Sequence, residues 1–283
     1  MATSHSNSDQ STSISAAALA RTLGSASHPL VIDVRREAAF QASPNLLCGA
    51  IRRLPETIEQ WHTELAGARQ VVTVCVHGHE VGQNAASFLR QRGFDARHLV
   101  EGIEGWLEAG LPSLGKTEFY DGTKATRWVT RARPKIDRIA CPWLIKRFID
   151  PRATFHYVAE DDVLAAAERL DAIPFDIPGI RFSHGGPRCS FDSMLDDFAL
   201  RDPAMLRVAD IIRGADTSCL DLTAQSAGLY AISLGLGDLI QDDDALLQAG
   251  MTLYDALYRW QRDLGAETHA WPPRDATSGA TAR

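Results

Sequence analysis

Short, mostly apolar runs alternate with amphipathic segments through the N-terminal part of the chain. The runs lie at residues 30–35, 49–51, 71–76 and 98–100. After the third run, Val81, Ala85 and Leu89 recur at helical spacing, and Gly93 is a natural helix stop. Buried strands that alternate with helices usually pair in parallel, with helices on both faces of the sheet. The pattern therefore predicts an α/β domain with a doubly wound parallel sheet over residues 13–114.

The pattern changes beyond a polar stretch, residues 115–126, which we interpret as a linker. Strands are predicted at 128–133 and 155–158, and helices at 136–149, 161–170, 191–200, 203–213, 223–236 and 242–264. Pro142 requires the first of these helices to start there or to kink. Residues 127–266 are thus expected to form a helix-rich α+β domain, and residues 1–12 and 267–283 to be disordered tails.

The composition supports two globular domains and argues against several classes of protein. With 283 residues, 45% hydrophobic and 23% charged, the chain can bury two cores. No apolar run reaches the ~18 residues that span a bilayer, and residues 1–13 lack the basic start and apolar core of a secretory signal. We therefore expect no membrane partner. The net charge of −7 disfavours nonspecific nucleic-acid binding without excluding a local basic patch.

The cysteines indicate a reducing compartment. There are five, at positions 48, 75, 141, 189 and 219, and no two form a Cys-x-x-Cys pair. An odd number in this arrangement argues against a disulfide framework and against a four-cysteine zinc site. It favours a location in the cytoplasm.

Cys75 is the strongest candidate for chemistry. It ends the apolar run 71–76, and a helix is predicted after the loop formed by Val76, His77, Gly78, His79 and Glu80. In a strand–loop–helix, loop amides and the helix dipole favour a thiolate and lower the thiol pKa from its usual ~8.5. The alternative is a buried structural cysteine at the end of a strand.

Residues 13–114 resemble the rhodanese-like family. The matching features are Asp33-Val34-Arg35, the Cys75 loop with its Gly78, and the closing pattern Gly102…Trp106…Gly110-Leu111-Pro112. The resemblance implies that Cys75 carries a persulfide, that residues 75–80 form the active-site loop and that Asp33 and Arg35 support it. A loop of six residues fits the sulfurtransferase type, with a small sulfur donor or acceptor as partner.

This loop lacks the cationic residues that thiosulfate-using rhodaneses place there. It contains two histidines and Glu80 instead. A carboxylate repels a dianionic donor, whereas two imidazoles can supply positive charge or general acid catalysis near neutral pH. We therefore predict weak or no thiosulfate:cyanide transfer.

Basic residues open the second half. Arg131, Arg133 and Lys135 share one parity, so a strand would place them on one face, and Arg138 follows in the next helix. Arginine side chains beside a helix N-terminus suit a tetrahedral oxyanion such as chromate, sulfate or phosphate. The alternative is an ordinary solvated strand face.

Two further groups of residues have metal-ligating chemistry. Asp137 and Cys141 are four residues apart and would share a helical face. His184 and Cys189 flank a Gly-Gly-Pro turn and could ligate a borderline metal, with Asp137, Asp192 or Asp216 completing the sphere. The possible cofactor is a divalent ion in the C-terminal domain. A structural histidine, with Ser190 capping a helix, is the alternative.

Residues 127–264 resemble the C-terminal domain of chromate-resistance proteins of the ChrB type. The resemblance rests on Thr130–Ile145, on Phe182–Phe191 and on Ala227–Leu236. It implies a role in chromate resistance, in some members as a sensor or regulator of an efflux operon. Our leading interpretation is a cytoplasmic thiol or sulfur-transfer protein with an oxyanion-linked second domain. The alternatives are a noncatalytic chromate-responsive regulator and a metalloenzyme centred on His184.

Overall fold

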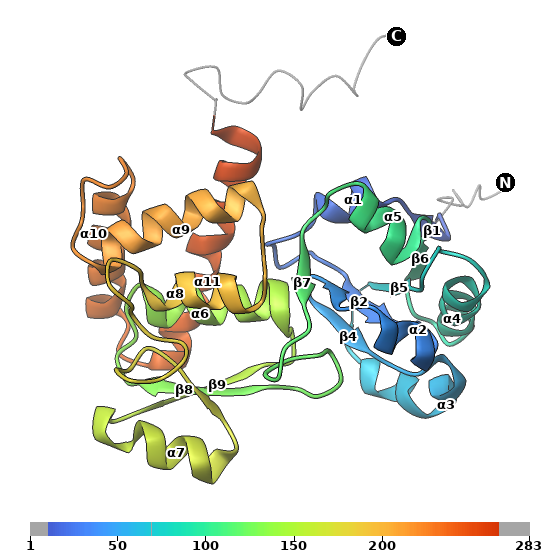
Figure 1. Cartoon of the computed structure of the whole chain (residues 1–283), viewed down its shortest axis with the longest axis horizontal. Helices are drawn as coiled ribbons and strands as arrows, with labels where there is room; N and C mark the ends of the chain where they lie inside the picture. Colours follow the sequence, from blue (N-terminus) through green and yellow to red (C-terminus); the bar gives the residue numbers. More distant parts are fainter. Residues whose placement is uncertain (1–10, 69, 266–283) are drawn as a thin grey trace, which may run out of the picture.

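The computed structural model describes residues 11–68 and 70–265, which form two α/β units side by side (Figure 1). The N-terminal unit contains a five-stranded sheet in the order β1-β6-β5-β2-β4, and every neighbouring pair is parallel. In chain order the strands are β1 (Ser13–Ile14), β2 (Leu30–Asp33), β4 (Ala50–Arg52), β5 (Val71–Val74) and β6 (Ala96–Leu99). The predicted parallel sheet is confirmed.

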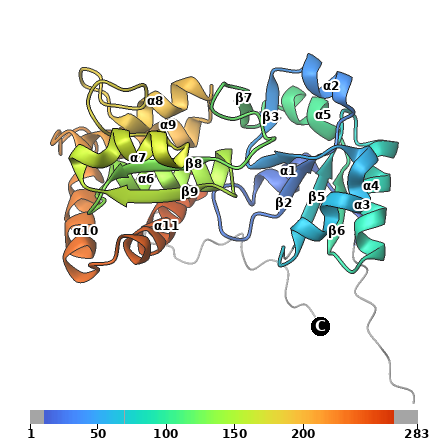
Figure 2. The same cartoon turned by 90° about the horizontal axis from the view of Figure 1, so that it is seen from below.

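Helices cover both faces of this sheet, as alternate strand residues require. They are α1 (Ala16–Ala20), α2 (Glu37–Ala42), α3 (Ile58–Trp61), α4 (Glu80–Gln91) and α5 (Gly102–Glu108). Val72 and Val74 belong to a core with α1, α2 and α5, whereas Val71 belongs to a second core with α3 and α4. The two separate cores define a doubly wound sheet (Figure 2).

A small antiparallel pair and a packed connection lead out of the first unit. Strand β3 (Asn45–Leu47) pairs with β7 (Ser113–Gly115). The connecting residues 115–126 are anchored to the first unit, because Tyr120 is buried and its hydroxyl donates to the Ala50 carbonyl at 2.9 Å. The Gly122 carbonyl accepts from the Arg52 amide at 2.8 Å.

The C-terminal unit is a three-stranded parallel sheet packed against helices. Its strand order is β10-β8-β9, with β8 (Arg127–Arg131), β9 (Thr154–Val158) and β10 (Ile173–Pro174). Its helices are α6 (Asp137–Leu144), α7 (Val163–Leu170), α8 (Ser190–Asp197), α9 (Pro203–Asp216), α10 (Ser226–Leu239) and α11 (Asp243–Arg259). The helix-rich α+β character is as predicted.

Two predicted helices are interrupted near their ends. The segment 136–149 forms α6 and then a π turn, Ile145–Ile149, and α11 likewise passes into a π turn, Trp260–Leu264. Pro142 neither starts nor ends α6. A proline has no N–H to donate to the carbonyl four residues earlier, and the Arg138 carbonyl accepts from the Tyr157 hydroxyl at 3.3 Å instead.

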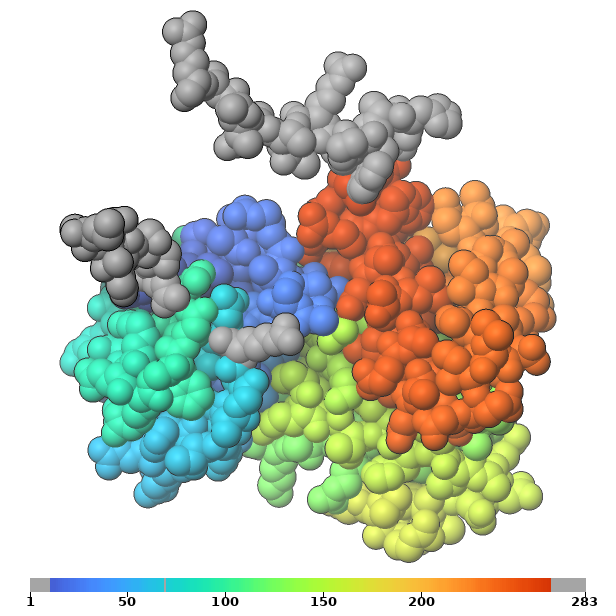
Figure 3. Space-filling model, turned by 180° about the vertical axis from the view of Figure 1, so that it is seen from behind, coloured from blue at the N-terminus to red at the C-terminus, as the bar shows by residue number. Residues whose placement is uncertain are grey.

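The two units share one apolar core, which fixes their arrangement. The core runs from Leu23 in the first unit to Phe148 and Tyr258 in the second. Gly24 has a positive φ of 67°, and a Cβ built there would lie 2.3 Å from Cδ1 of Tyr258, so only glycine permits this approach. Figure 3 shows the C-terminal helix beside the segment that follows α1.

Candidate functional site

Cys75 lies at the carboxyl end of the central strand β5, where ligands of parallel α/β sheets usually bind. The residue is 5% exposed, and its Sγ lies 3.8 Å from the His79 carbonyl oxygen. The first turn of α5 holds the backbone, because the amides of Ile103 and Glu104 donate to the carbonyls of Cys75 and Val76 at 2.9 and 3.1 Å. The cysteine is thus positioned by two elements.

The loop after Cys75 requires glycine at two points. Gly78 has a φ of +73°, and a Cβ there would lie 1.8 Å from the Val100 carbonyl oxygen. Gly102 has a φ of +63°, and its Cβ would lie 2.3 Å from the Val76 carbonyl oxygen. Both the dihedral angle and the close backbone approach exclude other residues. Because α4 begins at Glu80, the loop proper spans Val76 to His79, one residue shorter than predicted.

A pocket of about 260 Å³ lies over Cys75. The arginines that line it come from the segment after β2 and not from the loop that follows Cys75. Arg35, Arg36, His79 and Glu80 line the pocket together with the cysteine. The Arg35 guanidinium is buried and paired with Asp33 at 2.6 Å. Among the described residues, no group hydrogen-bonds to its buried Nη1. In the loop, His77 is exposed and pairs with Glu104 at 3.1 Å.

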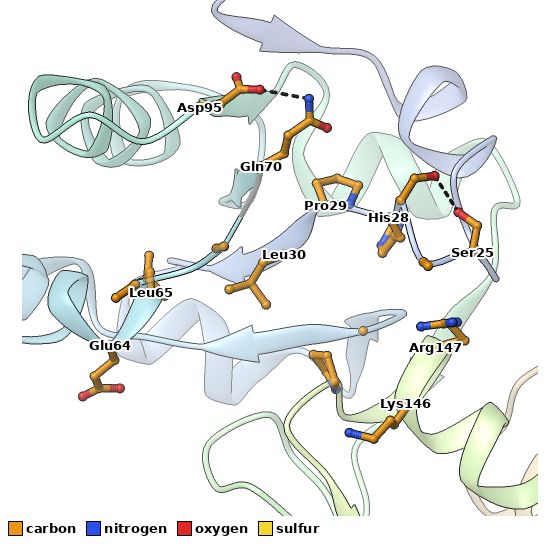
Figure 4. A pocket seen from close by; sticks show the side chains of 16 residues that line it. Ser25, His28, Pro29, Leu30, Glu64, Leu65, Gln70, Asp95, Lys146 and Arg147 are labelled. Carbon is orange, nitrogen blue, oxygen red and sulfur yellow. Dashed lines mark hydrogen bonds between the residues drawn. The ribbon is translucent and has the colours of Figure 1, made fainter. Parts of the chain in front are cut away.

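A larger cavity lies elsewhere, between the two units (Figure 4). It measures about 690 Å³ and lies at the amino ends of β2 and β5, where Pro29, Leu30 and Gln70 line it. Of its two basic residues, Arg147 is bound by Asp255 through two 2.8 Å hydrogen bonds, and burial lowers the pKa of Lys146. This cavity is therefore on the opposite edge of the sheet from Cys75 and is separate from the Cys75 pocket.

The three basic residues predicted to line one strand face, Arg131, Arg133 and Lys135, do not share it. Strand β8 ends at Arg131, and Arg133 has a φ of +57°, which breaks the alternation. The Arg133 side chain donates to carbonyls at the end of α10, and Lys135 lies over the Tyr230 ring. Arg131 and Arg138 do meet, because both contact Asp176 Oδ2, at 3.4 and 3.2 Å.

Three carboxylates surround the imidazole of His184. Its Nε2 lies 3.0 Å from Oδ2 of Asp216, 3.2 Å from Oδ1 of Asp176 and 3.7 Å from Oδ2 of Asp137. These residues come from the end of α9, the segment after β10 and the start of α6. We call Asp137, Asp176, His184 and Asp216 the carboxylate–histidine cluster. Ligand atoms of Asp137, His184 and Asp216 all lie within 4.8 Å of one another.

The cluster is electrostatically unusual because its carboxylates are close and poorly solvated. Burial raises the pKa of Asp137 well above its usual range, and the charges of Asp216 and Asp176 add to the effect. Burial and Asp176 likewise raise the pKa of Asp216. The hydrogen bond to Asp176 raises the pKa of His184 to about 9. Burial is thus the main cause for the two aspartates and a hydrogen bond for the histidine, and the neighbouring negative charges add to all three shifts.

Two predicted sulfur ligands lie outside this cluster. The Cys189 thiol contacts Oδ2 of Asp192 at 3.5 Å at the N-terminus of α8. Asp192 in turn accepts two 2.8 Å hydrogen bonds from Arg213. Cys141 is fully buried, and burial raises the pKa of both thiols. Of the predicted metal set, Asp137, His184 and Asp216 offer ligand atoms within 4.8 Å of one another, and Cys189 lies next to Asp137 without joining that group.

Family comparisons assign both units. Residues 15–109 match the model of the rhodanese-like domain, and residues 128–261 match that of the ChrB C-terminal domain. The chain joins a rhodanese-like domain to a ChrB C-terminal domain. This pairing is consistent with an association with chromate resistance.

A curated relative supports the assignment of the ChrB domain. The protein named ChrB from Cupriavidus metallidurans is 38% identical over 179 residues, which are 62% of this chain and 52% of that protein. This chain thus spans about half the length of the curated relative it matches.

Solved structures match about a third of the chain. A rhodanese-related protein from Thermoplasma volcanium is 24% identical and covers 36% of this chain and 97% of its own, with a TM-score of 0.32. A thiosulfate sulfurtransferase from Pseudomonas aeruginosa is 25% identical and covers 36% of this chain and 19% of its own, with a TM-score of 0.31.

Sequence reasoning missed one member of the cluster in the ChrB domain. Asp176 follows the two-residue strand β10 and has a φ of +55°, so no periodic pattern marks it. A positive φ at an aspartate is uncommon and is a weak signal of a special role.

Throughout residues 11–68 and 70–265, no helix combines the length and apolarity that crossing a membrane requires.

Proposed function

We propose that the rhodanese-like domain carries a transferable sulfur atom on Cys75. The observation that supports this most directly is the position of Cys75. It lies at the carboxyl end of β5, in a loop held by two glycines, and lines a pocket with Arg35 and Arg36. The two arginines place positive charge in the pocket where an anionic persulfide would lie.

The transfer takes place in two displacements. The Cys75 thiolate attacks the outer sulfur of a small persulfide, R–S–SH, so a new S–S bond forms and the old one breaks. The electron pair leaves with the thiolate R–S⁻, and Cys75 becomes Cys75–S–SH. An acceptor nucleophile then attacks the terminal sulfur and releases the Cys75 thiolate. No external oxidant or reductant is needed, because the sulfane sulfur moves with its oxidation state unchanged.

A monoanionic or neutral donor suits this pocket better than thiosulfate. Glu80 lines the pocket, and His77 is engaged by Glu104 rather than free to hold an anion. Arg35 is already paired with Asp33, so its charge is partly balanced. A dianion would therefore meet less net positive charge than the arginine count suggests. Weak thiosulfate:cyanide transfer remains part of the proposal.

Three of the other four cysteines are buried, which makes them poor competitors of Cys75 for the sulfur donor. Burial raises the pKa of Cys48, Cys141 and Cys189, so these thiols stay protonated and are poor nucleophiles near neutral pH. Cys219 is exposed and is the natural control. Because all five cysteines are free, the proposed site of action is the cytoplasm.

A turnover assay tests the proposal. The full chain is mixed with cysteine persulfide as donor and cyanide as acceptor, and thiocyanate is measured for wild type, Cys75→Ser and Cys219→Ser. We expect at least a hundredfold loss in Cys75→Ser, an unchanged rate in Cys219→Ser and a much slower rate with thiosulfate. Equal rates in wild type and Cys75→Ser would contradict the proposal.

We further propose that this activity contributes to chromate resistance through the fused ChrB C-terminal domain. Support comes from the name of the Cupriavidus relative and from the shared core, which holds the two domains together. The test compares bacterial growth in chromate when the cells express wild type, Cys75→Ser or no protein. Protection by wild type that Cys75→Ser lacks is the expected result. Equal protection by wild type and Cys75→Ser would show that chromate resistance does not depend on the Cys75 thiol.

A further inference from the structure

We propose that the carboxylate–histidine cluster binds one divalent first-row transition-metal ion, with Asp137, His184 and Asp216 as ligands. The site belongs to the ChrB C-terminal domain and does not depend on the sulfur chemistry of Cys75. Asp176 is a fourth oxygen donor beside these three residues and is held in place by Arg131 and Arg138.

The spacing of the ligand atoms matches that of a coordination sphere. A metal bound at roughly 2.1 Å to each ligand separates neighbouring ligand atoms by roughly 3.0 to 3.4 Å in octahedral or tetrahedral geometry. His184 Nε2 lies 3.0 Å from the Asp216 oxygen and 3.7 Å from the Asp137 oxygen. All three ligand atoms fall within 4.8 Å of one another. Only small side-chain movements are needed to receive an ion.

Asp137 provides an independent reason to expect a cation. Its side chain is fully buried, and its Oδ2 accepts from the amides of Ser190 and Phe191 at 2.6 and 3.3 Å. Its Oδ1 is also buried, and among the described residues no group hydrogen-bonds to it. A buried carboxylate oxygen without a partner costs on the order of 1–3 kcal/mol. A cation bound by the Asp137 carboxylate would compensate the buried negative charge that this oxygen shares with Oδ2, which lies 3.7 Å from His184 Nε2.

The donor set selects the class of metal. Two carboxylates and one imidazole suit Mn²⁺, Fe²⁺, Co²⁺ or Zn²⁺, whereas Mg²⁺ and Ca²⁺ prefer all-oxygen sites. Cys189 is not among the three residues whose ligand atoms lie together, so this ligand set lacks the soft sulfur that would favour Cu⁺. His184 is 42% exposed, so one side of the site is open to solvent. Three protein ligands with an open side are typical of reactive rather than purely structural metal centres.

The competing explanation is a metal-free ion-pair cluster, in which the imidazolium of His184 alone balances the carboxylates. The two explanations differ for Asp216→Asn. In an ion-pair cluster this change removes a partner of His184 and lowers the melting temperature of metal-free protein. In a metal site it relieves repulsion in the metal-free protein and removes the stabilisation that added metal provides.

The experiment measures metal binding to the full chain. Protein stripped with chelator is dialysed against Mn²⁺ or Zn²⁺, and bound metal is determined by elemental analysis, with melting temperatures recorded in parallel. The variants are Asp216→Asn and His184→Gln, and the matched control is Asp196→Asn, whose carboxylate pairs with Arg188 and Arg201 on the surface. Cys75→Ser is included to show independence from the thiol.

We expect close to one ion per chain in wild type, Asp196→Asn and Cys75→Ser, and at least tenfold weaker binding in the two cluster variants. Mg²⁺ at the same concentration should not compete. Binding far below one ion per chain, or equal binding in wild type and both cluster variants, would overturn the proposal. His184 is exposed, so replacing it by glutamine should leave the fold intact. The His184→Gln variant therefore still tests the proposal if Asp216→Asn does not fold.

Discussion

Replacing Gly78 by alanine should destabilise the chain through the loop that holds Cys75. The dihedral angle alone costs about 1–2 kcal/mol, because an L-residue is strained at a φ of +73°. The new Cβ would also lie 1.8 Å from the Val100 carbonyl oxygen, where real Cβ contacts stay above 3.0 Å. Overpacking against backbone typically costs about 1–3 kcal/mol more. The total loss in free energy of unfolding is about 2–5 kcal/mol.

Gly93→Ala is the matched control for this change. Gly93 also has a positive φ, of 87°, but a Cβ there meets no atom within 4 Å. Replacing either glycine by alanine restricts the conformations of the unfolded chain to the same extent. The difference between the two variants in free energy of unfolding therefore reports the contact with Val100. Gly93→Ala should therefore lose about 1 kcal/mol.

Urea unfolding followed by circular dichroism gives both free energies, and thermal melts provide a second measure. At about 2–4 °C per kcal/mol for a chain of this size, Gly78→Ala should melt roughly 4–20 °C below wild type. Its rate of sulfur transfer should fall with the displaced loop. Equal losses for Gly78→Ala and Gly93→Ala would refute the packing of the loop against Val100.

Three further predictions concern the same framework. Arg35→Met leaves the buried Asp33 carboxylate unpaired and should cost about 3–5 kcal/mol in urea unfolding, whereas a cost below 1 kcal/mol would show that the pair is not buried in solution. Burial lowers the pKa of His28 to about 4, below its unfolded value of 6.5, so protons bind the unfolded chain preferentially and stability is lost as pH falls from 6.5 to 4. His28→Gln should remove about 3 kcal/mol of that acid-induced loss, and parallel pH–stability curves for the two proteins would disprove it. Gly24→Ala should disturb the junction with Tyr258 and lower the melting temperature, and an unchanged melt would argue against the shared core.

Local patterns predicted the first domain well because its elements are encoded by neighbouring residues. A few neighbouring residues are enough to predict the strand that ends at Cys75 and the helix that follows it. Parallel pairing of the strands then follows from the alternation of strands and helices along the chain. The end of the loop was misplaced by one residue because Glu80 suits the first turn of a helix as well as a loop.

The second domain shows where such patterns fail. The parity of Arg131 and Arg133 predicted a shared strand face, but a positive φ at Arg133 ends the alternation. Ligand chemistry did identify His184 and Asp216 as metal candidates. Their convergence with Asp176 depends on how α9 packs beside the segment after β10, and no single stretch of sequence contains that information.

The presence of transferable sulfur on Cys75 is tested most directly by peptide mass spectrometry of the full chain after exposure to cysteine persulfide. The peptide containing Cys75 should gain the mass of one sulfur atom, and both a reductant and cyanide should remove it. The peptide containing the exposed Cys219 should keep its original mass under the same limited dose of donor. Sulfur found on Cys219 while Cys75 remains unmodified would contradict the account.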